Sequence, residues 1–274
     1  MAAQRKKMAG FLGLALLALA IACPRPAMAK CGGGAPSQVT IAAIGERFEI
    51  VLEDKRVIRL AGLDLPLAEE GDVRTTAAAS ALLTQKLVGQ NAQLTLYGAK
   101  PDRWGRLPGD IEAAPEGAAP VSTAKAMLEA GYARVRPEFE TKDCAGERLP
   151  LEAAARAAGR GLWTDSAYRV IEAGELEDLR RRDGQFTLVE GTVVKVGQGA
   201  SRIYLDFARR GGFTALALRS KSAEFAKAGI ALGDLTGVRV RVRGALDNRF
   251  GLRMDLIDPS EIERLDGGAQ ERGK

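Results

Sequence analysis

Between residues 238 and 243 the chain alternates strictly between valine and arginine. Successive side chains of a strand point to opposite faces, so this run predicts a half-buried strand over 238–244. The arginines that share its polar face are Arg239, Arg241 and Arg243. They would either follow the phosphates of a bound nucleic acid or keep an exposed edge strand soluble by their charge. A β-sheet is therefore the element that the fold must contain.

Short strand-like runs and amphipathic helical stripes alternate along the rest of the chain. Residues 101–109 are dense in proline and glycine and predict a turn-rich connection, whereas 172–183 predicts a charged, solvated helical linker. This mixture predicts an α+β fold with a small antiparallel barrel or sheet. Strands are expected at 47–52, 56–60, 93–97, 186–196, 202–207, 213–218 and 252–257, and helices at 75–88, 122–129, 151–158 and 222–228.

Histidine is absent from all 274 residues. Its absence excludes Ser-His and Cys-His nucleophiles, histidine-ligated zinc and proton transfer by imidazole. Any catalysis must therefore use carboxylates, arginine, lysine, tyrosine or a metal that oxygen ligands hold. With 46% hydrophobic and 27% charged residues, the composition is that of a folded protein and not of a disordered or polytopic membrane protein.

The first 29 residues predict an export signal. A basic start is followed by an apolar run from 8 to 22 and by Ala-Met-Ala at 27–29, a small-x-small cleavage site. The mature protein is then expected in the periplasm or outside the cell. The alternatives are an uncleaved N-terminal anchor and acylation of Cys23, which would tether the protein to a membrane. No later segment reaches about 18 consecutive apolar residues, so no further transmembrane segment is predicted.

Removal of the signal also changes the charge balance. The formal net charge is +5, but the mature part holds 36 basic and 35 acidic residues. Net charge alone is therefore no argument for nucleic-acid binding. The mature part also keeps two of the three cysteines, Cys31 and Cys144, and an even number in an oxidising compartment predicts a disulfide. Two unrelated thiols are the alternative.

The segment 59–66 reads Arg-Leu-Ala-Gly-Leu-Asp-Leu-Pro, and Arg106 ends a tight Asp-Arg-Trp-Gly-Arg turn about forty residues later. Two arginines from separate segments can hold one phosphate through forked, charge-assisted hydrogen bonds. A neighbouring carboxylate such as Asp64 can hold a divalent cation. Taken singly, an arginine and an aspartate at this spacing form a structural salt bridge more often than a site.

In their order along the chain these motifs resemble those of the staphylococcal nuclease (thermonuclease) family. The likeness covers about residues 39–165, and it continues with Leu-Glu-Ala-Gly-Tyr-Ala at 128–133, Glu-Ala-Ala-Ala-Arg at 152–156 and Leu-Trp at 162–163. The resemblance implies an OB-fold barrel with three helices. The strand pattern after it, five strands with one helix after the third, predicts a second, small β-rich domain that we interpret as OB-like. The expected segments are a signal peptide (1–29), a flexible lead-in (30–38), the nuclease-like domain (39–168), a charged linker (169–184), the OB-like domain (185–265) and a disordered tail (266–274).

The resemblance also implies a reaction, the calcium-dependent hydrolysis of nucleic-acid phosphodiesters. Arg59 and Arg106 match the two phosphate arginines, and Asp64 matches a metal carboxylate. Two positions depart from the family pattern. Leu67 stands where the general-base glutamate belongs, and Glu46 is an imperfect substitute in the family's Asp-Gly-Asp metal loop. The sequence therefore supports a weakened exported nuclease for DNA or RNA, or a degenerate module that binds nucleic acid or protein without cutting. An envelope scaffold without a nucleic-acid ligand is the remaining alternative.

Overall fold

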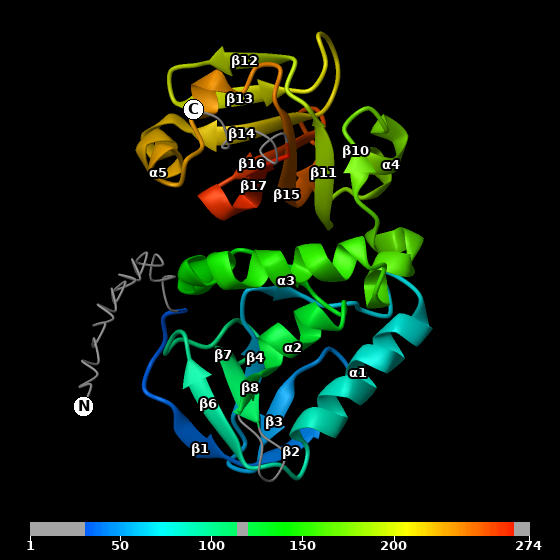
Figure 1. Ribbon diagram of the computed structural model, residues 1–274, viewed down its shortest axis with the longest axis vertical. Helices are drawn as coiled ribbons and strands as arrows, with labels where there is room; N and C mark the ends of the chain where they lie inside the picture. Colours follow the sequence, from blue (N-terminus) through cyan, green and yellow to red (C-terminus); the bar gives the residue numbers. More distant parts are fainter. Residues whose placement is uncertain (1–30, 114–119, 266–274) are drawn as a thin grey trace, which may run out of the picture.

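The computed structural model describes residues 31–113 and 120–265, which form two modules, each built on its own β-sheet (Figure 1). Both modules combine strands with helices, so the predicted α+β fold is confirmed. Helix α3 (Ala145–Ala157) lies between the two sheets in Figure 1. The predicted export signal, the acylation site Cys23 and the predicted tail from residue 266 lie outside the described residues.

The sheet of the first module has the strand order β1-β6-β7-β4-β3-β2, and β8 pairs with β7. Neighbouring strands are antiparallel except β4 and β7, which run parallel with Ile58 opposite Leu107. A separate ladder joins β5 (Leu63–Asp64) and β9 (Arg134–Val135). The sheet strands are β1 (Ser37–Val39), β2 (Ile41–Ile44), β3 (Ile50–Leu52), β4 (Val57–Leu60), β6 (Ala92–Leu96), β7 (Arg106–Ala113) and β8 (Val121–Ser122).

The sheet of the second module has the order β10-β11-β15-β16-β14-β13-β12, and β17 pairs with β15. Two of its pairs are parallel, β10 with β11 and β14 with β16. Its strands are β10 (Ile171–Glu172), β11 (Phe186–Thr192), β12 (Lys195–Gln198), β13 (Arg202–Asp206), β14 (Thr214–Leu218), β15 (Arg239–Asp247), β16 (Arg253–Leu256) and β17 (Ile262–Arg264).

The two sheets share one connectivity. In the first module the first strand is split into β1 and β2, which stand at opposite ends of the main strand order. In the second module β11 and β12 are placed in the same way, except that β10 extends the sheet beyond β11. The second and third strands form a hairpin, a helix follows the third strand, and the fifth strand lies parallel to the third. The strands β3, β4, β6 and β7 of the first module therefore correspond to β13, β14, β15 and β16 of the second.

The helices cover the sheets with their apolar faces. Helix α1 (Val73–Leu87) begins where the Asp72 side chain accepts a hydrogen bond from the backbone N–H of Arg74, a typical N-cap. No described helix is long and apolar enough to cross a membrane. The other helices are α2 (Thr123–Glu129), α4 (Leu176–Arg181) and α5 (Ser222–Lys227), with 3₁₀ turns η1 (Phe139–Cys144), η2 (Gly161–Thr164), η3 (Ser166–Tyr168), η4 (Arg219–Lys221), η5 (Leu232–Asp234) and η6 (Pro259–Glu261).

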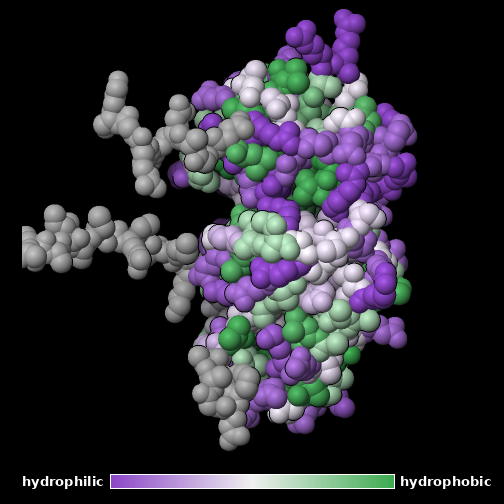
Figure 2. Space-filling model, turned by 45° about the vertical axis from the view of Figure 1, so that its right-hand side comes forward, coloured by the Kyte–Doolittle hydropathy of each residue, from purple (hydrophilic) through white to green (hydrophobic). Residues whose placement is uncertain are grey.

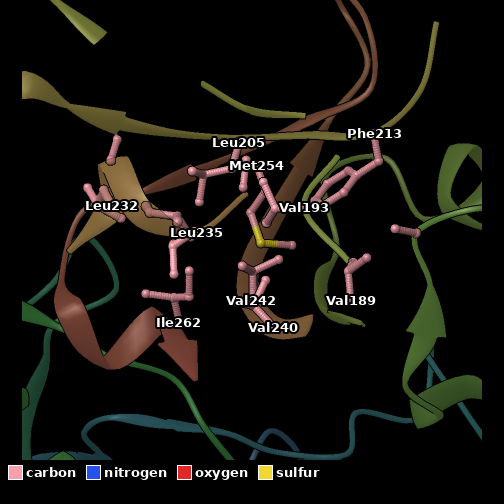
Figure 3. Packing of buried hydrophobic residues seen from close by; sticks show 14 of the residues in the cluster. Val189, Val193, Leu205, Phe213, Leu232, Leu235, Val240, Val242, Met254 and Ile262 are labelled. Carbon is pink, nitrogen blue, oxygen red and sulfur yellow. The ribbon is translucent and has the colours of Figure 1, made fainter. Parts of the chain in front are cut away.

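Each module buries its own hydrophobic core. In the second module, Val240 and Val242 of β15 pack with Leu205 of β13, Met254 of β16 and Phe213, which directly precedes β14 (Figure 3). The first core gathers residues of β3, β4 and β6 with the inner faces of α1 and α2. On the side of the molecule shown in Figure 2, hydrophobic and hydrophilic surfaces are interspersed over both modules. The chain therefore contains two layered units with separate cores.

Two local predictions are wrong. The turn predicted over 101–109 ends early, since β7 begins at Arg106 and passes through Gly109. A Cβ at Gly109 would lie 3.0 Å from the carbonyl oxygen of Thr95, so the glycine permits this close strand pairing. The segment 172–183 is not solvated throughout, because Leu179 of α4 is fully buried in the second core.

The two modules meet through a buried ion pair. Arg243 of β15 donates a hydrogen bond of 2.7 Å from Nη1 to Glu152 of α3, and neither side chain is exposed. Arg243 also donates to the backbone oxygen of Val135, and Arg134 of β9 donates to the backbone oxygen of Phe186. Burial opposes the ionisation of Glu152, but the charge and hydrogen bonds of Arg243 lower the pKa of this carboxyl below its usual value. The contact between the modules is therefore charged, desolvated and directional.

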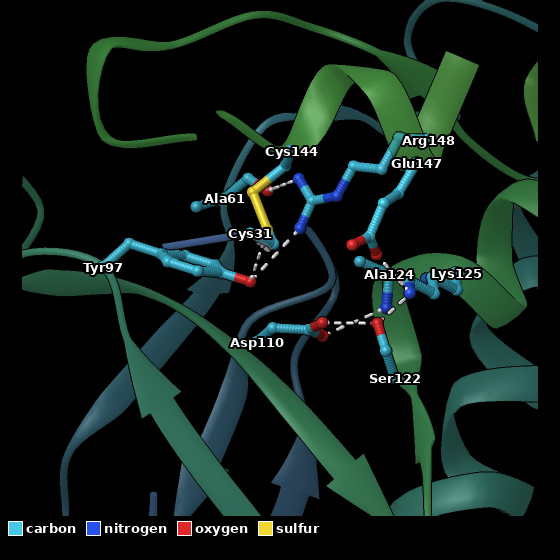
Figure 4. Close-up of a disulfide and its surroundings, with 10 residues drawn as sticks. All are labelled: Cys31, Ala61, Tyr97, Asp110, Ser122, Ala124, Lys125, Cys144, Glu147 and Arg148. Carbon is cyan, nitrogen blue, oxygen red and sulfur yellow. Dashed lines mark hydrogen bonds and ion pairs between the residues drawn. A yellow bond between two sulfur atoms is a disulfide. The ribbon is translucent and has the colours of Figure 1, made fainter. Parts of the chain in front are cut away.

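The predicted disulfide is present between Cys31 and Cys144 (Figure 4). It ties the start of the described chain to the end of η1, across a sequence separation of 113 residues. Arg148 lies beside the bridge and donates a hydrogen bond of 2.7 Å to the backbone oxygen of Ala61. The disulfide therefore joins the N-terminal segment to the residue that directly precedes α3.

Glu261 makes the stability of the second module depend on pH. Burial raises the pKa of this carboxyl to about 7, although the backbone N–H groups of Asp258 and Ile257 oppose the shift. Because the folded state then binds the proton more tightly than the unfolded state, the stabilisation is complete below about pH 4.5 and is lost as the pH rises through 7. We expect Glu261→Gln to raise the free energy of unfolding at pH 8 by about 1–2 kcal/mol relative to wild type, and not at pH 4. Urea unfolding at both pH values measures this, and equal effects at the two values would contradict it.

Candidate functional site

A cleft of about 770 Å³ opens on the first module, beside the hairpin of β3 and β4 and the start of β7. The side chain of Arg59 enters it from β4, where the neighbouring Ile58 and Leu60 are buried in the core. The alternation of the strand therefore turns Arg59 to the outer face of the sheet. Arg106 enters the same cleft from the first position of β7.

The two arginines converge on one carboxylate. Asp102 Oδ2 lies 2.9 Å from Nε of Arg106 and 3.8 Å from Nε of Arg59. The turn that ends at Arg106 holds Asp102 in place, because its Oδ1 accepts hydrogen bonds from the backbone N–H groups of Trp104 and Arg106. Partial burial opposes ionisation, but the hydrogen bonds from Arg106 and Trp104 lower the pKa of Asp102. The motif spacing therefore brings both guanidinium groups to one place.

Further carboxylates occupy the same arginines. Glu138 accepts hydrogen bonds of 2.7 and 3.0 Å from Nη1 of Arg59, and Glu49 lies 3.5 Å from Nη1 of Arg106. Each of these four side chains is only about one-fifth exposed, so the pairs are partly desolvated. A phosphate that approached this cleft would have to displace carboxylates that are already bound.

Asp64 lines the same cleft but is held by other arginines. This carboxylate is 8% exposed at the end of β5, and its Oδ2 accepts a hydrogen bond of 2.8 Å from Nε of Arg134, which is 2% exposed. The second oxygen lies 4.0 Å from Nη1 of Arg136. Arg134 also contacts the second module through the backbone oxygen of Phe186, so the predicted metal carboxylate belongs to the contact between the modules.

The residues present do not fit a calcium ion. Calcium takes six to eight oxygen ligands, and Asp64 is held by one guanidinium and faces another. Glu46 is exposed and does not line the cleft, where Glu49 is found in its place. Within the parts of the chain that the structure describes, no group of three or more acidic or cysteine side chains could hold a metal. No step of a reaction is therefore assigned to calcium.

Leu67 lines the cleft at the position where the resemblance implies a glutamate. Its side chain packs partly against the first core, and an aliphatic group cannot accept a proton. Glu69, two residues further on, forms an ion pair with Arg47. Glu70 also lines the cleft, and burial followed by the charge of Asp64 raises its pKa. Leu67, at the position of the family's general base, therefore cannot act as an acid or a base.

The three arginines of β15 all form ion pairs, and Arg239 is the most exposed of them at 39%. Arg243 is fully buried, Arg241 is 12% exposed and pairs with Glu190, and Arg239 pairs with Glu172. β15 is also no edge strand, since it pairs with β11 on one side and with β16 and β17 on the other. Both interpretations from sequence, a phosphate track and a charged edge, are therefore wrong for this strand.

Several residues that line or adjoin the cleft could not be recognised from the sequence. Glu138 lies 79 residues from Arg59, and Arg134 lies 70 residues from Asp64, so neither pairing has a local signal. Trp104 is 63% exposed beside the cleft, and the guanidinium of Arg106 stacks over its ring at 4.8 Å. The sequence does offer one hint for Trp104, since an exposed tryptophan in a tight turn rarely serves a core.

The comparison with known families agrees with this geometry. No curated protein matches the chain. A family model described as Staphylococcal nuclease homologue matches residues 57–165, which include the cleft arginines, the turn at Asp102 and helix α3. The arrangement of β3, β4 and β7 around the cleft is consistent with an OB-fold barrel. The matched segment and the fold together support a staphylococcal nuclease-like domain in the first module of this chain.

Proposed function

We propose that the staphylococcal nuclease-like domain is a binding module that does not hydrolyse phosphodiesters. One observation carries the proposal, namely that Arg59 and Arg106 share Asp102 and are each bound by a further carboxylate. The loss of a general base at Leu67 costs about 10²–10⁴ in rate on its own. The engagement of both arginines removes the preorganised positive charge that a phosphoryl transition state needs.

The charges of the cleft favour a polypeptide segment as its ligand. Arginines and carboxylates both line its walls, together with apolar Leu65 and Leu67 and exposed Trp104. A polyanion would meet as much repulsion as attraction there, whereas a peptide with both charges can pair with each sign. The charged lining residues are Arg47, Arg59, Arg106 and Arg136 against Glu49, Asp64, Glu70, Asp102 and Glu138.

The nuclease hypothesis has one observation in its favour, the convergence of Arg59 and Arg106 within one cleft. It lacks a glutamate at position 67, where the family's base belongs, and it lacks a metal-ligand set among the described residues. We also infer export, which the disulfide between Cys31 and Cys144 supports because disulfides persist in oxidising compartments. The connectivity that the second module shares with the first supports our interpretation of it as OB-like.

A nuclease assay tests the absence of hydrolysis. We expect the mature protein with calcium to cleave single-stranded DNA, duplex DNA and RNA no faster than the same protein with EGTA or than Arg106→Ala. Leu67→Glu should also stay inactive, because the added carboxylate would face arginines that Asp102 and Glu138 already hold. Calcium-dependent cleavage that Arg106→Ala abolishes would overturn the proposal.

Peptide selection tests the binding function. Peptides selected on the mature protein from a random displayed library should share a consensus with charges of both signs. Their affinity, measured by titration calorimetry, should fall about tenfold in Trp104→Ala. Phe250→Ala provides the control, because Phe250 is an exposed aromatic residue of the other module. Equal losses in the two variants, or no consensus at all, would contradict the assignment of this cleft.

A further inference from the structure

The second module presents an exposed aromatic ring on the outer face of its sheet. Tyr204 of β13 is 37% exposed, while its chain neighbours Ile203 and Leu205 are buried in the core. In register, Tyr204 stands opposite Gly197 of β12 and Leu216 of β14. The ring therefore lies on the side of the sheet that faces away from the second core.

Two glycines of the neighbouring segment keep this ring uncovered. A Cβ at Gly199 would lie 3.2 Å from Cε2 of Tyr204, and a Cβ at Gly197 would lie 3.5 Å from its Cβ. The tyrosine side chain therefore runs along backbone that carries no side chains. Glycine within a strand often marks such a close approach. One face of the ring is supported by the backbone, and its other side is available to a flat ligand.

Two arginines flank the ring. Arg219 donates a hydrogen bond of 3.3 Å to the backbone oxygen of Gly199, which places its guanidinium next to the ring. Arg202 stands opposite Leu218, which is 46% exposed, at the same end of β13. In the described part of the chain neither arginine forms an ion pair with a carboxylate. Their charges, unlike those in the first module's cleft, are not neutralised by close acidic partners.

The charge balance of the two modules also favours an anionic ligand for the second module. Residues 185–265 hold thirteen arginines and lysines against nine acidic residues, whereas residues 30–170 hold eighteen against nineteen. Asp206 borders the ring on the side away from Arg202, where it accepts a hydrogen bond from Thr214. A polyanion is therefore attracted to the second module, and to the end of β13 that carries Arg202 and Arg219.

The Tyr204 surface occupies the same position on its sheet as the cleft occupies on the sheet of the first module. β13 and β14 occupy the places in the strand order that β3 and β4 occupy in the first module. Arg59 projects from the outer face of β4, and Leu216 projects from the corresponding face of β14 beside Tyr204. The shared connectivity thus gives two equivalent surfaces. The cleft of the first module carries paired charges, whereas the surface of the second module carries the exposed Tyr204 ring and, among the described residues, two arginines without a carboxylate partner.

We propose that Tyr204, Arg202 and Arg219 form a binding site for single-stranded nucleic acid. A base would stack on the open face of the Tyr204 ring, and the two guanidinium groups would each bind a phosphate of the adjoining backbone. Stacking accepts any base, so the site has no sequence preference. The inference does not rest on the function of the cleft, because the two surfaces belong to different modules.

The binding is measured by the fluorescence anisotropy of labelled ten-residue oligothymidine and oligouridine with the mature protein. We expect saturable binding, weaker by about tenfold in Tyr204→Ala and retained in Tyr204→Phe, which keeps the stacking ring. Two phosphate contacts predict an affinity that falls about sevenfold between 50 and 200 mM salt. In the double variant Arg202→Ala, Arg219→Ala this salt dependence should nearly disappear.

Matched controls separate this site from the rest of the surface. Phe139→Ala removes an exposed aromatic ring of the first module and should leave the affinity unchanged. Stronger binding of one oligonucleotide would identify DNA or RNA as the ligand. Absence of saturable binding to both, or equal affinities of wild type and Tyr204→Ala, would overturn the proposal. The peptides selected on the mature protein provide a further test. If their binding is lost in Tyr204→Ala, this face binds protein, and the proposal of a nucleic-acid site is overturned.

Discussion

Arg243→Met should lower the free energy of unfolding by about 3–5 kcal/mol, the largest single effect that we expect in this chain. The variant keeps most of the side-chain volume but leaves Glu152 ionised and buried without its main partner. Urea unfolding at pH 7, followed by far-ultraviolet circular dichroism, measures the loss. Because the pKa of Glu152 is lowered in the folded protein, its contribution in wild type should fade as the pH falls below about 4.5.

Two further variants make this test specific. Arg249→Met removes an arginine that is 78% exposed and paired with Asp247, and it should change stability by less than about 1 kcal/mol. The double variant Arg243→Met, Glu152→Gln removes the buried charges together and should recover part of the loss. A loss for Arg243→Met no larger than that for Arg249→Met would show that the contact between the modules contributes little.

The second large effect concerns the disulfide. Replacement of both Cys31 and Cys144 by alanine should lower the free energy of unfolding by about 2–4 kcal/mol, because a closed loop of this length strongly restricts the unfolded chain. Thermal unfolding of wild type with a reducing agent should give the same loss. The double variant should not respond to the reducing agent, and an unchanged melting temperature for reduced wild type would contradict the prediction.

The sequence predicted the parts of the fold and the site that depend on local chemistry. The placement of Arg59 and Arg106 in one cleft follows from a strand end and a tight turn, both of which are visible over a few residues. The family match at residues 57–165 confirms the resemblance on which the first module was assigned. The proposed roles of these arginines, of Asp64 and of Glu46 stay predictions.

What the sequence could not predict depends on contacts between distant segments. The alternation over 238–243 correctly predicted a strand, but no local pattern shows that α3 of the other module covers Arg243. The partner of Asp64 escaped detection for the same reason, since Arg134 has no mark that separates it from a surface arginine. The repeat of one connectivity in the two modules is likewise a property of strand pairing and leaves no obvious trace in the residues.

The buried pairing of Arg243 with Glu152 has a consequence for how two ligands would be held together. We expect a junction of this kind to resist hinge motion and thereby to keep the separation between the cleft and the Tyr204 surface nearly constant. A partner with two recognition elements on one tether would then gain avidity through a high effective concentration at the second surface. The gain would depend sharply on tether length, with a single optimum set by the spacing of the modules.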